Sequence, residues 1–113
     1  MAKSMQDIML KIIERTQFNS FEGRSICQSL RLHRDLWRAV MLTRTDPGII
    51  LRDLSDNHYN ADTLLILTWP DQELALRELV ATWHPDAVSG VSNPSSFLMV
   101  SPTPHVVLSC WWD

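Results

Sequence analysis

The stretch TLLILTWPDQELALRELVATWHPD, residues 63–86, determines the fold that we expect for this chain. The run LLIL at 64–67 is continuously apolar, which is typical of a strand covered on both faces. Pro70 suits the first turn of a helix, because the N–H that proline lacks would be unpaired there anyway. Apolar residues at helical spacing follow as far as Pro85, which cannot continue a helix. We therefore predict a buried strand that leads directly into an amphipathic helix.

The segments after this helix predict further strands. Residues 87–96 form a linker rich in Ser, Asn, Gly and Pro. Residues 97–100 and 105–112 are apolar and flank a proline-rich turn, so we expect them to pair as an antiparallel hairpin. Both faces of the last strand are apolar, which indicates cover on each side of the sheet.

The segments before residue 63 predict mainly helices. Residues 4–16 begin at Ser4, a good N-cap with an acidic residue three positions later. Residues 17–23 form a turn, and residues 24–43 show apolar positions at helical spacing over their whole length. Residues 48–54 are ambiguous between strand and helix, and the preceding Asp-Pro pair leads us to favour a short helix.

Together these segments predict a single α+β domain over residues 1–113. We expect a small mixed or antiparallel sheet of three to four strands, with a β-α-β-β C-terminal half covered by two N-terminal helices. Apolar residues make up 45% of the chain, enough for a core without a disulfide or metal. With neither a signal-peptide pattern nor a run long enough to cross a bilayer, we expect a cytoplasmic protein that does not enter a membrane.

The two cysteines, Cys27 and Cys110, fall in a predicted helix and a predicted strand. In the cytoplasm we expect two reduced, buried thiols, although the sequence leaves a disulfide between them open.

Charge is distributed unevenly along the chain. Residues 1–52 carry nine Lys or Arg against five acids, whereas residues 53–113 carry only Arg77 against eight acids. Such asymmetry indicates either a basic surface for a partner or two halves that face each other, within one chain or across a dimer. We favour the second interpretation because it needs no additional partner.

A basic stripe on the predicted helix 24–43 is the sequence's only pointer to nucleic acid. Its members are Arg24, Arg31, Arg34 and Arg38. Arginine stems often lie over apolar surface on a solvated helix face. Because nucleic-acid-binding domains are usually strongly basic and this chain has a net charge of −3, we do not expect nucleic acid as the partner.

The segment ALRELVATWHPD, residues 75–86, resembles the end of the second helix of a J-domain. In that family the His-Pro-Asp tripeptide contacts a heat-shock chaperone, a role that the resemblance would give to His84, Pro85 and Asp86. The resemblance covers 12 of the 113 residues. The segment before it is strand-like, and Glu73 and Glu78 stand where the family is rich in lysine. A helix that stops at His-Pro, with Asp in the following turn, explains the same residues.

No catalytic constellation, metal site or cofactor is predicted. Four scattered histidines and two cysteines lack the close spacing of a metal site, and three isolated glycines cannot build a phosphate-binding loop.

Tryptophan is the remaining signal, with five in 113 residues. Neighbouring residues of a strand point to opposite faces, so Trp111 and Trp112 cannot easily enter the same core. Exposed tryptophan is enriched at binding hot spots. The expected ligand or interface residues are Trp69, Trp83, His84, Asp86, His105, Trp111 and Trp112.

Our preferred hypothesis is a non-catalytic interaction module that forms a homodimer and binds a protein or a small apolar ligand. The first alternative is a ligand-binding domain or enzyme whose pocket is lined by Trp69, Trp83 and Trp111, with His84 or His105 as its polar group. The second alternative is nucleic-acid binding through the arginine stripe.

Overall fold

The structure, a computed structural model, describes residues 4–113 and shows an α+β fold built on a four-stranded antiparallel sheet. The sheet has the order β3-β4-β6-β5, and a separate short hairpin is formed by β1 and β2. In chain order the strands are β1 (Gln17–Phe18), β2 (Phe21–Glu22), β3 (Ala39–Thr43), β4 (Thr63–Thr68), β5 (Ala87–Gly90) and β6 (Val106–Trp111).

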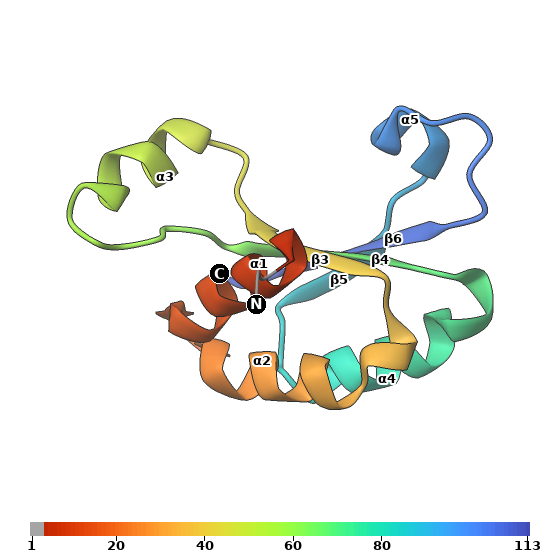
Figure 1. Cartoon of the computed structure of the whole chain (residues 1–113), viewed down its shortest axis with the longest axis horizontal. Helices are drawn as coiled ribbons and strands as arrows, with labels where there is room; N and C mark the ends of the chain where they lie inside the picture. Colours follow the sequence, from red (N-terminus) through yellow and green to blue (C-terminus); the bar gives the residue numbers. More distant parts are fainter. Residues whose placement is uncertain (1–3) are drawn as a thin grey trace.

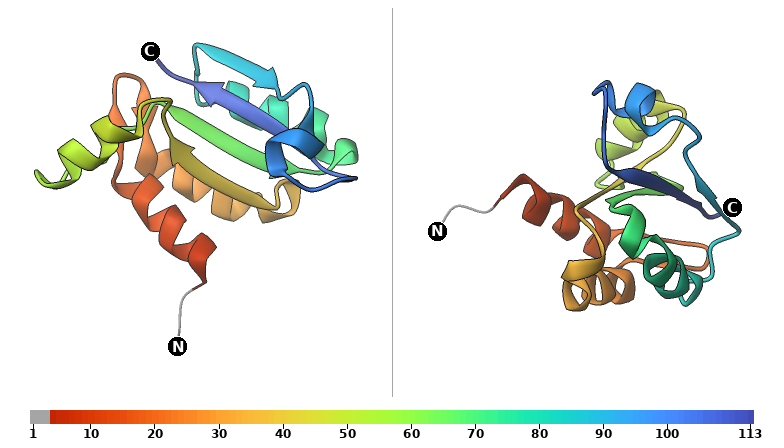
Figure 2. Two further views of the ribbon diagram at one scale, coloured as in Figure 1. Left: turned by 90° about the horizontal axis from the view of Figure 1, so that it is seen from above. Right: turned by 90° about the vertical axis from the view of Figure 1, so that its right-hand side faces the viewer.

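The helices divide between the two faces of the sheet (Figure 1). The α-helices are α1 (Met5–Arg15), α2 (Gly23–Leu32), α3 (Pro47–Leu54), α4 (Glu73–Ala81) and α5 (Pro94–Leu98), with 3₁₀ turns η1 (Arg34–Leu36) and η2 (Pro70–Gln72). α1, α2 and α4 lie against one face, whereas α3 and α5 rise from the other as two separate arms (Figures 1 and 2). Among residues 4–113 there is no helix of the length and apolar character that crossing a membrane requires.

The predicted strand-to-helix unit is confirmed. β4 occupies the centre of the sheet, and Pro70 opens the 3₁₀ turn that leads into α4. α4 ends at Ala81, and His84 then adopts a left-handed conformation with φ of 55°. The capping box at Ser4 and the short helix after Pro47 are also confirmed.

The predicted helix over residues 24–43 is wrong in its second half. α2 ends at Leu32, Trp37 is extended with φ of −145°, and residues 39–43 form the edge strand β3. Val40 and Leu42 are buried while Met41 is exposed, the alternation of a strand. In so short an apolar run both periodicities fit, and pairing with β4 decided between them.

The predicted C-terminal hairpin is also wrong. Residues 87–90, expected to be linker, form β5, and residues 94–98 form α5 instead of a strand. Asn93 caps α5 through a hydrogen bond from Ser96 N at 3.2 Å, and Pro94 occupies the first turn. β6 therefore pairs with β4 on one side and β5 on the other.

The core lies between the sheet and the layer formed by α1, α2 and α4. The sheet contributes Val40, Leu42, Leu64, Ile66, Leu108 and Cys110, all at most 5% exposed. The β1–β2 turn supplies Phe21, whose ring stacks on Phe18 and meets Trp112 edge-on, each with centroids 4.9 Å apart. Cys27 and Cys110 are free and buried.

Candidate functional site

The second face of the sheet is apolar but is not covered by helices along its centre. Residues paired across neighbouring strands point to the same face, so the register gives its rows. Ala39, Leu67 and Val107 form one row, and Met41, Leu65 and Ser109 form the next. Thr43, Thr63 and Trp111 form the third row. Met41 is 43% exposed and Trp111 is 40% exposed. We call this surface the open face.

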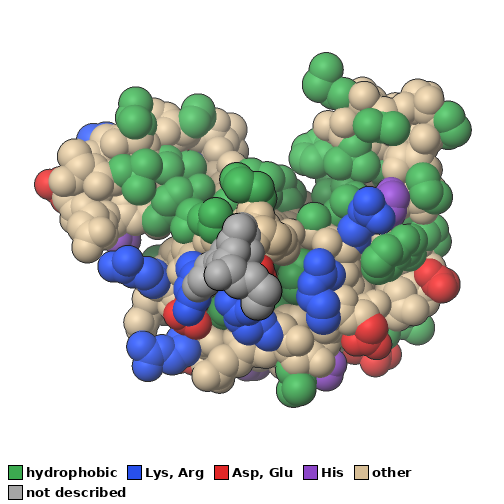
Figure 3. All heavy atoms as spheres, in the orientation of Figure 1, with side chains coloured by type: hydrophobic (Ala, Val, Ile, Leu, Met, Phe, Trp, Pro, Cys, Tyr) green, Lys and Arg blue, Asp and Glu red, His purple; other side chains and the backbone are tan. Residues whose placement is uncertain are grey.

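The open face is flanked by the arms at opposite ends of the strands. α3 joins the end of β3 to the start of β4, and α5 lies between β5 and β6. Phe97 and Leu98 of α5 overhang the first row and enclose with it a cavity of about 210 Å³. Apolar side chains line both lobes and the notch between them (Figure 3). The arrangement is a trough with an apolar floor.

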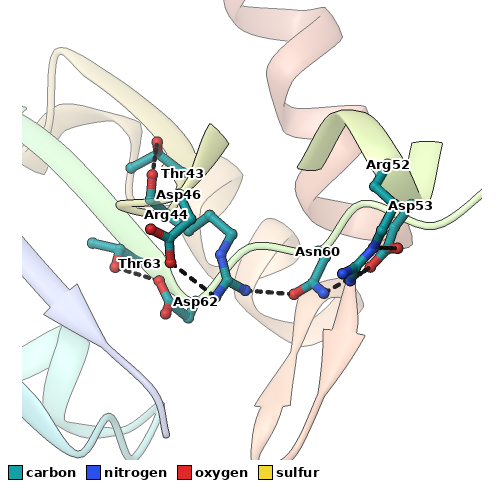
Figure 4. A network of polar contacts seen from close by, with 8 residues as sticks. All are labelled: Thr43, Arg44, Asp46, Arg52, Asp53, Asn60, Asp62 and Thr63. Carbon is teal, nitrogen blue, oxygen red and sulfur yellow. Dashed lines mark hydrogen bonds and ion pairs between the residues drawn. The ribbon is translucent and has the colours of Figure 1, made fainter. Parts of the chain in front are cut away.

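A polar network holds the α3 arm at its base (Figure 4). Arg44 donates from Nη1 to Asn60 Oδ1 at 2.7 Å, and its Nη2 lies 3.8 Å from Asp46 Oδ2. Asn60 donates to Asp53 Oδ2 at 2.8 Å, and Arg52 adds two further bonds to the same carboxylate. Hydrogen bonds from Arg52 and Asn60 hold the pKa of Asp53 well below its ordinary value. The contacts that lower this pKa are the same ones that join Asp53 to Arg52 and Asn60 at the base of the arm.

The open face carries no charged side chain. Its three rows contain only apolar residues, threonines and a serine. Residues 87–112, which include the α5 arm, contain no Asp, Glu, Lys or Arg. Depletion of charge is what distinguishes the centre of a protein interface from ordinary surface.

The five tryptophans and their histidine partners do not converge on one site. Trp112 is fully buried, and its Nε1 donates to Trp83 O at 3.2 Å beneath the sheet. Trp111 lies on the open face, at the end of the strands beside the α3 arm. Trp69 lies at the opposite end, where its ring centroid is 6.0 Å from that of His105.

Trp83 and His84 line a separate cavity of about 220 Å³ with residues of the β2–α2 junction. Trp83 is 7% exposed, and its Nε1 has no hydrogen-bond partner among the described residues. Neither Trp69 nor Trp111 lines this cavity. Asp86 accepts a bond at Oδ2 from Asp113 N at 2.7 Å, which ties the residue before β5 to the segment after β6.

The arginine stripe is not a single helix face. Arg24 and Arg31 lie on α2, but Arg34 and Arg38 follow it, because the helix stops at Leu32. Arg34 lies 3.9 Å from the centre of the Trp37 ring and donates to Trp37 O at 2.6 Å. Arg34 therefore supports the chain reversal after α2. Residues 4–113 contain no group of three or more His, Cys, Asp or Glu arranged to hold a metal ion.

The buried thiol of Cys110 is a titratable group in the core, and its effect on stability can be measured. Burial raises the pKa of its thiol to about 12. In the unfolded chain a thiol titrates near ~8.5, so above this pH the unfolded state binds fewer protons than the native state. We expect stability to fall as pH rises from about 9 to 12, by up to ~1.4 kcal/mol per pH unit from this group.

Denaturant titrations of the wild type and Cys110→Ala across this pH range measure that component, which the variant lacks. In the native protein at pH 8, Ellman's reagent should not label the thiol. Equal pH slopes for the two proteins, or rapid labelling, would contradict the assignment.

Sequence reasoning missed most of the open face. The predicted helix 24–43 includes Met41 and the predicted strand 97–100 includes Phe97. Leu65, Leu67 and Val107 belong to strands for which the sequence predicts cover on both faces. The available signal was the apolar character of both faces of β4 and β6, for which cover was expected on each side. The structure covers one of those faces with α1, α2 and α4, whereas on the other face α3 and α5 stand at the ends of the strands and leave the centre uncovered.

No protein-family model matches the chain, and neither a curated protein nor a solved structure matches it significantly.

Proposed function

We propose that this protein is a non-catalytic docking module whose open face holds an apolar helix of a partner protein. The observation that carries the proposal is an uncharged, apolar sheet face left uncovered between two arms. Large exposed apolar patches on soluble domains commonly mark interaction sites. We retain the expectation of a cytoplasmic location, to which two free thiols are suited.

The dimensions of the trough support a helix as the occupant. The six residues of β4 span about 20 Å at ~3.3 Å per residue, and the arms stand at the two ends of that span. A helix with its side chains is about 10 Å across. One helix lying across the strands would cover Met41, Leu65 and Trp111 and would convert the two-layer fold into three layers.

The cavity under α5 supports an anchored mode of docking. Its lining includes Leu67 and Val107 of the sheet and Phe97 of the arm, and it opens onto the floor of the trough. Hot spots of binding are large side chains that fill well-packed apolar pockets. We propose that one Leu, Met or Phe of the partner helix fills this cavity, with further apolar residues at helical spacing along the floor.

The variant that tests the proposal is Met41→Glu. A carboxylate on the floor would be buried without a partner in the complex but remains partly solvated in the free protein. We expect affinity for the partner helix to fall roughly tenfold or more, with little loss of stability. Leu74→Glu is the matched control, because Leu74 is 72% exposed and lies on α4, on the other side of the sheet.

A photo-crosslinking residue at position 41, compared with one at position 74, identifies the bound segment in cells. The segment is then synthesised as a peptide and titrated against the wild type and both Glu variants, with intrinsic tryptophan fluorescence, to which Trp111 contributes, as the readout. The proposal predicts a helix-forming peptide with apolar residues at i, i+3, i+4 and i+7. It fails if position 41 captures nothing beyond the control, captures only a second copy of this chain, or if both Glu variants bind equally well.

A further inference from the structure

The two edge strands of the sheet differ in whether their outward main-chain groups are hydrogen-bonded, and those of β3 are. In an antiparallel ladder alternate residues direct their N–H and C=O groups to the neighbouring strand, so those between them face outward. The main-chain N–H and C=O of Val40 point outward from the edge of β3, and each lies 3.0 Å from the side-chain amide of Gln6. Leu42 O accepts a bond from the Tyr59 hydroxyl at 3.1 Å. Side chains thus occupy the positions that another strand would take.

The edge at β5 has no such protection. On β6 the even-numbered residues bond to β4, as Trp112 N does to Asp62 O, and the odd-numbered residues bond to β5, as Val107 O does to Val91 N. The main-chain groups of Val88 and Gly90 therefore point away from the sheet, and among the described residues nothing is bonded to them there. No described element lies beyond β5 in the left-hand view of Figure 2.

The sequence of β5 also lacks two of the usual devices against edge pairing, charged side chains and proline, although at four residues the strand is short. Exposed edges are normally blunted by charged side chains, proline or covering loops. β5 reads AVSG and contains neither charge nor proline. Because the β3 edge is blocked and the β5 edge is not, the β5 edge is the one available to pair with a further strand.

We infer that β5 pairs antiparallel with β5 of a second copy of this chain, which joins the two sheets into one of eight strands. Outward residues must oppose outward residues, and the register that uses both of them in each copy places Val88 opposite Gly90 of the other copy. Each of these pairs exchanges both N–H···O bonds, and Ser89 then lies opposite Ser89 of the second copy at the two-fold axis.

Charge favours a second copy as the occupant of this edge. The Arg77 guanidinium lies against Gly90, since a Cβ at Gly90 would stand 3.3 Å from Arg77 Nη2. Asp86 is exposed and lies at the other end of β5. Antiparallel pairing brings each copy's Asp86 to the end where the other copy's Arg77 lies and keeps the two Asp86 residues apart. Arg77 uses Nε for Glu73 at 2.9 Å and has further donors for Asp86.

Pairing at β5 does not occupy the open face. Ser89 lies in the same row as Met41 and Leu65 but at the far margin of the sheet. The dimer would carry two troughs on one face of a continuous sheet, which would make the module bivalent for its partner. The inference of a dimer and the proposal of a docked helix can therefore be tested separately, the first with variants at Ser89 and the second with Met41→Glu.

Charge variants at the two-fold axis test the inference. Sedimentation equilibrium over a concentration series should give the wild type twice its 13.0 kDa mass. Ser89→Lys and Ser89→Glu each place like charges directly opposite one another, and each should raise the dimer dissociation constant about fivefold or more. An equimolar mixture of the two should recover dimer, because the opposed charges then attract. Ser25→Lys, an exposed serine on α2, is the matched control and should remain dimeric.

Ser89→Cys provides a test that does not depend on weakening the dimer. Directly opposed residues of a non-hydrogen-bonded pair have Cα atoms about 4.5 Å apart, within the range of a disulfide. Mild oxidation should link the two copies at position 89 faster than a Ser25→Cys control. A wild type that is monomeric at every concentration overturns the inference, as does a dimer that Ser89→Lys leaves unchanged or a cysteine at 89 that links no faster than the control.

Discussion

Replacing Gly23 with alanine is expected to lower the free energy of unfolding by about 3 kcal/mol or more. Gly23 is the first residue of α2 and is buried where α2 meets the end of α1. A Cβ at this position would overlap the carbonyl oxygens of Ile13 and Thr16, which are backbone atoms and cannot rotate aside. Gly23 N also donates to Thr16 O at 3.0 Å, so the two chain segments cannot separate without losing that bond.

The sign of this effect distinguishes close packing from helix propensity. Alanine is the better helix former by about 1 kcal/mol, so propensity alone predicts that Gly23→Ala stabilises the protein. Gly48→Ala is the matched control, because Gly48 lies in the first turn of α3 with nothing within 4 Å of its Cβ position. We expect that control to be neutral or stabilising by up to ~1 kcal/mol. Thermal and denaturant unfolding of both variants decides the matter, and an unchanged midpoint for Gly23→Ala would refute the packing argument.

The second large effect is expected at Trp112. Trp112→Ala should cost about 3–5 kcal/mol, the range for removing a large aromatic side chain from a core. The side chain is 0% exposed, meets the Phe21 ring at 87°, and donates from Nε1 to Trp83 O at 3.2 Å. Its removal would leave a cavity and an unpaired buried carbonyl.

Trp111, the neighbour of Trp112 in the chain, provides the comparison for this loss of stability. Trp111 is 40% exposed on the open face, so Trp111→Ala should cost less than about 1 kcal/mol in stability while weakening binding of the partner helix. Trp112→Phe keeps the ring but removes the hydrogen bond and should fall between the two. Chemical denaturation of the three variants gives the order, and comparable losses at 111 and 112 would mean that the two faces of β6 are equally buried.

The two adjacent tryptophans also illustrate how far the sequence alone reaches towards a site. Period-two alternation along a strand requires that Trp111 and Trp112 face opposite ways, and the structure confirms that one is buried and the other exposed. The same rule could not say which face the helices would cover. The predicted pocket of Trp69, Trp83 and Trp111 grouped residues by chemical type, whereas the register places Trp69 and Trp111 at opposite ends of the strands.

The sequence by itself determined the elements whose signals are local. Pro70 after an apolar run, Ser4 with its capping box and Pro47 at a helix start each act on neighbouring backbone groups, and each predicted its element correctly. The tertiary structure decided the rest. Residues 39–43 and 87–90 form strands because they pair with β4 and β6. The free energy of that pairing comes from residues distant in the sequence, so the local sequence does not reveal it. The open face and the free β5 edge also belong to the tertiary structure, because the first depends on where the helices pack and the second on the order of the strands.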